Sequence, residues 1–110
     1  MSKEPLYQDE KLKIEYLPNS HEDHLVYIRE SSGEEYRYVI QRGILEDLAR
    51  TARGGIENKL QWSNQDLLFV LKKENISVDA LHIAICQAYA EEKERVLYHK
   101  IESFLKANIF

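Results

Sequence analysis

The 110-residue chain contains one cysteine, two prolines and four glycines. The single cysteine, Cys86, has no partner for an internal disulfide, which is typical of a protein that folds in a reducing compartment. The scarcity of proline and glycine argues against long disordered or low-complexity segments. Chains of this length usually bury enough apolar surface to fold without covalent cross-links. We therefore predict one domain spanning residues 1–110.

Long apolar runs are also missing. The longest mainly apolar segment, Ala80 to Ala90, is interrupted by His82 and Gln87 and is too short to span a bilayer. No charged and then apolar leader of the secretory kind opens the sequence, so we expect a cytoplasmic location and no membrane partner. The formal net charge of -4 repels polyanions at long range. Nucleic acid is therefore ranked behind another protein as the expected partner.

Alternating apolar and polar residues predict strands in the N-terminal part. Lys11 to Leu17 alternates strictly, which is typical of a strand buried on one face. Two further runs, His24 to Glu30 and Glu35 to Arg42, are rich in β-branched and aromatic residues and are flanked by turn-forming residues. These three runs predict a three-stranded antiparallel β-meander.

The turn between the second and third runs sets the register of their side chains. If Ser32-Gly33 forms a two-residue turn, Arg29 lies opposite Tyr36 and Tyr27 opposite Tyr38, all on one face. A one-residue change in loop length would change this pairing. Because arginine and tyrosine are enriched at contact surfaces, we predict a partner-binding patch formed by Tyr27, Arg29, Tyr36 and Tyr38. In the alternative, the tyrosines face the core with their hydroxyls at its edge.

Helical spacing of apolar residues begins at Ile44. We predict three helices, which run from Ile44 to Arg53, from Ser63 to Asn75 and from Val78 to about Ala107. The first should end at Gly54-Gly55, the second should start with a capping box formed by Ser63 and Asp66, and Ser77 or Asp79 should cap the third. Because the strands precede the helices, we predict an α+β fold with an N-terminal three-stranded antiparallel meander followed by three helices, the last one long.

The last helix changes character along its length. Ala80 to Ala90 is apolar nearly all round, which predicts a segment enclosed on several sides. Beyond it the helix is heavily charged and keeps a narrower apolar stripe, formed by Val96, Leu97, Ile101, Phe104 and Leu105. We expect this stripe to dock on the domain. The alternative is a homodimer through the C-terminal helix, because narrow apolar stripes on charged helices are common seams.

Arginines cluster between the second strand and the first helix. Five of them supply the candidate nucleic-acid surface, namely Arg29, Arg37, Arg42, Arg50 and Arg53. A phosphate loop at Gly54-Gly55 is not predicted, because such a loop needs glycines in front of a helix, whereas these glycines follow a predicted helix as its C-cap.

Two groups of residues have the chemistry of metal ligands. The first is the loop His21-Glu22-Asp23-His24, and the second is the pair His82 and Cys86, one helical turn apart. Neither has the further ligands of an established metal motif, and no catalytic signature is present, so we predict no metal, cofactor or catalytic residue. The function predicted is a non-catalytic intracellular protein-binding or regulatory module. The alternative is a nucleic-acid-associated regulator using the arginines, and the third candidate is a small metal-dependent protein or enzyme.

Overall fold

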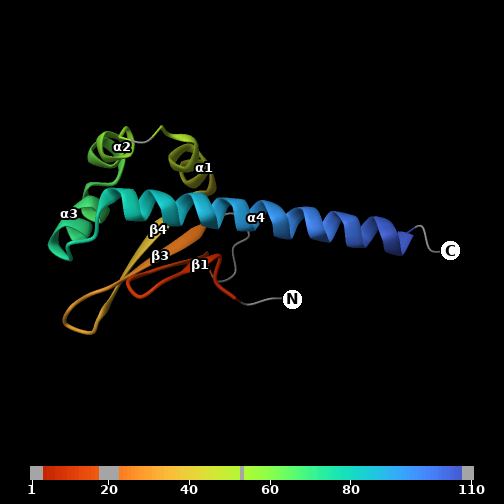
Figure 1. The fold of residues 1–110 in the computed structure, drawn as a ribbon, viewed down its shortest axis with the longest axis horizontal. Coiled ribbons are helices and arrows are strands. Elements are labelled where there is room, and N and C mark those ends of the chain that lie inside the picture. Colours follow the sequence, from red (N-terminus) through yellow and green to blue (C-terminus); the bar gives the residue numbers. More distant parts are fainter. Residues whose placement is uncertain (1–3, 18–22, 53, 108–110) are drawn as a thin grey trace.

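The computed structural model describes residues 4–17, 23–52 and 54–107. Within these ranges, four strands precede four helices (Figure 1). The elements are β1 (Tyr7–Gln8), β2 (Leu12–Tyr16), β3 (His24–Arg29), β4 (Glu35–Ile40), α1 (Arg42–Arg50), α2 (Ile56–Ser63), α3 (Gln65–Lys73) and α4 (Val78–Ala107). The predicted α+β class, the meander followed by helices and the long last helix are confirmed.

The strands form one antiparallel sheet in the order β1-β2-β3-β4. The first strand was not predicted, because two residues are too few to show a period. It is turned into the sheet by Asp9, whose Oδ1 accepts hydrogen bonds of 2.8 Å from the backbone N–H groups of Lys11 and Leu12. This turn sets Tyr7 opposite Ile14.

The predicted register between β3 and β4 is wrong by one residue. The turn contains three loop residues, Ser31 to Gly33, and the Glu30 backbone N–H donates to the Glu34 carbonyl oxygen. Gly33 has a φ of 93°, so its lack of a Cβ is needed at the position that closes this longer loop. As a result, Tyr27 lies opposite Arg37 and Val26 opposite Tyr38. Side chains predicted to share a face lie on opposite faces.

The core is formed by the inner face of the sheet, by α4 and by the buried sides of α1, α2 and α3. Figure 1 shows α4 running between the sheet on one side and α1 and α2 on the other. Its buried apolar positions follow the spacing of a single helical face and are Leu81, Ala84, Ile85 and Ala88. The sheet contributes its own buried apolar row from alternate positions, including Leu12, Ile14, Val26 and Ile28.

An additional helix, α2, occupies the segment after the paired glycines. The first helix ends at Arg50, with Thr51 as an extended C-cap, and Gly55 precedes α2 as its N-cap. The prediction that Gly54-Gly55 ends the first helix as its C-cap is therefore wrong, because these glycines directly precede a helix. Among the α2 side chains that the structure describes, Ile56 and Leu60 are the buried ones, and two positions are too few to stand out in the sequence.

The ends of α3 and α4 follow local capping rules closely. Asn75 adopts a left-handed φ of 57° after α3, and the next residue, Ile76, donates its backbone N–H to the Leu71 carbonyl oxygen. Ser77 Oγ accepts a 3.0 Å hydrogen bond from the Ala80 backbone N–H, which confirms the predicted cap of α4. The predicted capping box at Ser63 is wrong, because Ser63 is the last residue of α2 and Asn64 is the N-cap of α3.

Candidate functional site

The four residues of the predicted Tyr/Arg patch do not form one surface. The register places Tyr27 and Arg29 on the outer face of the sheet, whereas Tyr36 and Tyr38 point to the inner face and pack against the core. The structure therefore supports the alternative interpretation for Tyr36 and Tyr38, in which the rings pack on the core and the hydroxyls lie at its edge.

Tyr38 joins the sheet to the helices. Its hydroxyl donates a 2.5 Å hydrogen bond to Oδ1 of the buried Asn64, between α2 and α3, and its ring stacks on Tyr36 with the ring centroids 6.4 Å apart. Burial raises the pKa of both tyrosines, and the nearby Asp66 carboxylate raises each pKa further. Both rings therefore remain neutral at physiological pH and act in packing.

Tyr27 lies on a mixed-charge outer sheet surface. Lys13 Nζ lies 4.3 Å from the centroid of its ring, and the Arg37 guanidinium carbon lies 5.5 Å from it. Burial, followed by a hydrogen bond with Glu15, raises the pKa of the Tyr27 hydroxyl. Arg29 lies across the strands from Glu35. Alternating charges of this kind are typical of a solvated sheet face.

The five arginines are not brought together among the described residues. Arg29 and Arg37 lie on the outer sheet face, while Arg50 belongs to α1 on the far side of α4 and pairs with Glu46 at 2.9 Å. Arg42 is the first residue of α1, and Arg53 lies outside the described residues. The structure therefore gives no joint basic surface for the described members of this set.

The predicted ligand loop at residues 21–24 contains one residue with an unforeseen role. His21 and Glu22 lie outside the described residues. His24 is fully buried as the first residue of β3, and its Nε2 lies 2.7 Å from Oε2 of the buried Glu92 on α4. The ring of Tyr16 covers His24 at a centroid distance of 5.3 Å. No sequence pattern links positions 24 and 92, so this pair could not be predicted.

The predicted pair His82 and Cys86 lies on the part of α4 beside α1, and within the described residues the buried Nε2 of His82 has no hydrogen-bond partner. The Cys86 thiol donates to the Ala49 carbonyl oxygen at 3.5 Å and so contributes to packing between α4 and α1. Burial raises the pKa of this thiol, which disfavours the thiolate needed for nucleophilic attack or metal binding. The described residues contain no group of three or more histidine, cysteine or acidic side chains placed to hold a metal ion.

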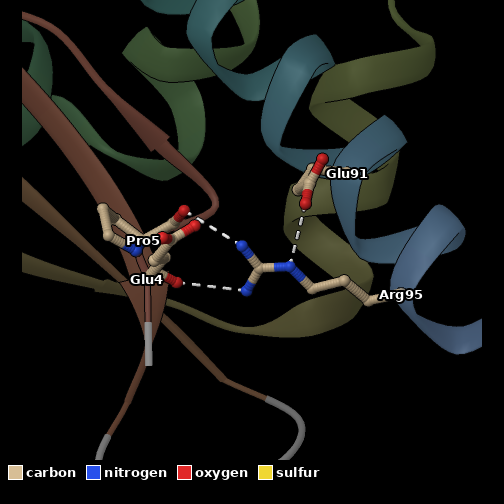
Figure 2. A network of polar contacts seen from close by, with 4 residues as sticks. All are labelled: Glu4, Pro5, Glu91 and Arg95. Atoms are coloured by element: carbon tan, nitrogen blue, oxygen red, sulfur yellow. Dashed lines mark hydrogen bonds and ion pairs between the residues drawn. The ribbon is translucent and has the colours of Figure 1, made fainter. Parts of the chain in front are cut away.

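Arg95 marks the point where α4 leaves the body of the protein. Its guanidinium donates to the carbonyl oxygens of Glu4 and Pro5 at 3.1 and 3.2 Å, and its Nε pairs with Glu91 at 2.9 Å (Figure 2). Beyond this contact the helix extends past the sheet and the other helices (Figure 1). We call residues 96–107 the α4 arm.

The apolar stripe of the arm is exposed, so the expectation that it docks on the domain is wrong. Its members are between 41% and 65% exposed, and they are Val96, Leu97, Ile101, Phe104 and Leu105. The reason lies in helix geometry. Leu81 is buried on the inner side of α4, and His99 lies on the same side because it follows Leu81 by about five turns. In the arm, this side of the helix therefore carries a polar residue. Leu97 and Ile101 lie on the opposite side of α4, away from the sheet.

A hollow lies between α4 and the middle of α1, at Glu46. It has a volume of about 210 Å³ and is lined by Glu46, Tyr89, Glu92, Lys93, Val96, Leu97 and Lys100. Phe104 follows Cys86 by about five helical turns, so it continues the side of α4 that contacts Ala49 of α1. The hollow and the stripe are therefore continuous along one side of α4, with α1 covering its beginning.

Comparisons with family models, curated proteins and solved structures found no match for this chain. Among the described residues, no helix combines the length and apolar character required to cross a bilayer. The surface properties of the chain itself therefore carry the functional argument.

Proposed function

We propose that the protein is a non-catalytic intracellular binding module that recognises another protein through the α4 arm. The observation that carries this proposal is the exposed apolar stripe on a helix that projects past the rest of the fold. Side chains such as Leu97 and Phe104 cost free energy when they face water, and a contiguous exposed group of this kind marks interaction sites.

The geometry favours a helix as the bound element. The stripe advances along α4 in steps of three and four residues from Leu97 through Ile101 to Phe104, which is the spacing that pairs one helix with another. The neighbouring α1 already covers the earlier part of the same side of α4 at Cys86. A partner helix on the arm would continue this packing and fill the hollow beside Tyr89 and Val96.

The Tyr/Arg surface has less support as the binding site. Tyr38 is committed to Asn64, and only Tyr27 and Arg29 of the four predicted residues face outward. The nucleic-acid alternative also loses its main argument, since Arg37 and Arg50 lie on different sides of the molecule. The arm is therefore the surface to test first.

The experiment is affinity capture of tagged protein from a lysate, with and without nuclease, using two matched variants. Phe104→Glu places a charge in the stripe, and Phe69→Glu places the same charge at an equally exposed phenylalanine on α3, since the two are 65% and 69% exposed. We expect a stoichiometric protein partner that survives nuclease, is lost with Phe104→Glu and is kept with Phe69→Glu. Retention by Phe104→Glu, or loss of all bound material on nuclease treatment, would contradict the proposal.

A further inference from the structure

The strand β4 forms an open edge of the sheet. It is the last strand in the order β1-β2-β3-β4, and within the described part of the chain no further strand lies beside it. Edge strands are commonly protected from pairing by proline, by a bulge or by charged side chains. β4 has no proline, its register with β3 is continuous over six residues, and its charged residues, Glu35 and Arg37, have opposite signs. This edge is therefore suited to accept another strand.

The hydrogen-bond pattern of the hairpin shows which backbone groups of β4 face the open edge. The Glu30 backbone N–H donates to the Glu34 carbonyl oxygen at 2.8 Å, so Glu34 and the alternate residues after it direct their backbone groups toward β3. The residues between them direct their N–H and C=O groups to the open edge, and they are Glu35, Arg37 and Val39. Among the described residues, these backbone groups have no hydrogen-bond partner.

Charge selects the register in which a second β4 can pair with this edge. Two copies related by a two-fold axis perpendicular to the sheet run antiparallel and keep their outer faces on one side. With Tyr36 on the axis, Glu35 of each copy lies opposite Arg37 of the other, and opposite charges in this position stabilise a strand pair. The neighbouring registers that keep the faces matched set Arg37 against Arg37 or Glu35 against Glu35. The charge pattern of β4 is therefore complementary to itself in one register.

The same register brings aromatic side chains together on the inner face. Tyr36 directs its backbone groups toward β3, so it meets its counterpart as a non-hydrogen-bonded pair, in which the Cα atoms are about 4.5 Å apart. Its ring stacks on Tyr38 of the same strand, and both rings are only partly buried in the single chain. Aromatic pairs in directly opposite positions add to the stability of a strand pair.

We propose that two copies of this chain pair antiparallel through β4, so that the protein is a homodimer with one continuous sheet. The backbone groups of Glu35 and Arg37 in each copy are then hydrogen-bonded to Arg37 and Glu35 of the other, and their side chains form ion pairs on the outer face. This inference goes beyond the proposed function, because the α4 arm takes no part in the pairing. Each dimer presents two arms to other proteins.

Sedimentation velocity of the full chain over a wide concentration range tests the dimer. We expect a dimer whose Kd rises roughly 30-fold in Arg37→Glu, because both ion pairs then become pairs of like charge. The matched control is Lys13→Glu, since Lys13 and Arg37 both lie over the ring of Tyr27 but Lys13 belongs to β2, away from the edge. Circular dichroism verifies that both variants fold. A wild-type monomer at the highest concentration, or equal weakening by the two variants, would overturn the inference.

A charge exchange shows whether these contacts form between copies. Arg37→Glu and Glu35→Lys should each weaken the dimer alone, but their mixture should form a heterodimer, because every carboxylate then faces a cation across the axis. Arg37→Pro removes a backbone N–H that faces the open edge, so it should be a monomer that keeps its pairing with β3. A mixture that pairs no more tightly than either variant alone, or a dimer retained by Arg37→Pro, would overturn pairing through β4.

The arm variant separates this inference from the proposed function. Phe104→Glu should leave the dimer intact, because Phe104 lies in the arm, and loss of the dimer in this variant would overturn pairing through β4. If the wild type is a monomer and a captured protein is lost with Arg37→Pro but kept with Phe104→Glu, the edge binds a strand of a different protein and the homodimer is overturned.

Discussion

His24 on β3 and Glu92 on α4 form a buried pair across 68 positions of the sequence, with His24 Nε2 2.7 Å from Glu92 Oε2. The pair fixes the first residue of a central strand to the helix one turn before the arm begins. Within the described part of the chain, His24 Nδ1 has no hydrogen-bond partner. The Glu92 carboxylate is thus the polar contact that offsets the burial of this imidazole.

Removing the carboxylate should destabilise the fold. In Glu92→Ala the buried imidazole loses its partner, so we expect the free energy of unfolding to fall by about 3 kcal/mol. Glu92→Gln keeps an acceptor oxygen and should lose less. Urea denaturation followed by circular dichroism measures both changes. A matched control is Glu94→Ala, an exposed position on the same helix, which should change little. Equal losses for Glu92→Ala and Glu94→Ala would show that the pair contributes nothing.

Glu74 gives the protein a pH-dependent contact between the β3–β4 turn and the end of α3. The backbone N–H and the hydroxyl of Ser31 both donate to its carboxylate, at 3.1 Å to Oε1. The backbone hydrogen bond lowers the pKa of Glu74 below its ordinary value of 4.5, against the opposing effect of burial. Because the folded-state pKa is the lower one, this contribution to stability is present above the ordinary pKa and is lost as the pH falls through the folded-state value.

Glu74→Gln should therefore have its largest effect at neutral pH. We expect a lower Tm than that of the wild type at pH 7, and a difference that shrinks as the pH falls below 4.5, because the wild-type carboxylate then becomes protonated. Thermal melts across this range measure the effect. Glu34→Gln, at an exposed position beside the same turn, is the control. A Tm difference for Glu74→Gln that stays constant with pH would rule out the charged contact as its source.

The hydrogen bond from Tyr38 to Asn64 should be structural. Tyr38→Phe deletes the hydroxyl and leaves the buried amide oxygen of Asn64 without this donor, so we expect a loss of about 1 kcal/mol in the free energy of unfolding. Tyr27→Phe removes a hydroxyl from the outer sheet face and should cost less. Chemical denaturation of both variants tests the assignment. If Tyr38→Phe is as stable as the wild type and loses a protein partner instead, the predicted role of Tyr38 in binding is restored.

Sequence patterns predicted those parts of the fold that depend on local chemistry. Val78 to Ala107 was recognised as one helix because it has good helix formers, a serine cap and no internal glycine or proline. The predicted register failed because a two-residue and a three-residue loop at Ser31-Ser32-Gly33 use similar residues but reverse the faces of the strand. The short elements β1 and α2 offered too few positions for a periodic pattern.

The candidate site could be predicted only in part, for a related reason. The apolar stripe from Leu97 to Phe104 was visible in the sequence, since it depends on spacing within one helix. Its exposure was not, because that depends on where α1 and the sheet end along α4. The pairing of His24 with Glu92 is set by tertiary packing alone, and neither residue has a local pattern that identifies the other.

Cys86 should react slowly in the folded protein. Burial raises the pKa of its thiol above the ordinary value of 9.0, and the Sγ atom donates to the Ala49 carbonyl oxygen, so both the thiolate fraction and the access of a reagent are reduced. We expect the rate at which a thiol reagent modifies Cys86 at pH 8 to be roughly tenfold lower in the folded protein than in the same protein unfolded in urea. An exposed reference thiol comes from Lys106→Cys in a Cys86→Ala background, and it should react at about the rate of the unfolded chain. If native Cys86 reacts as fast as that reference thiol, Cys86 is accessible to solvent and does not pack against Ala49 of α1. The side of α4 that leads into the arm would then be uncovered already at Cys86.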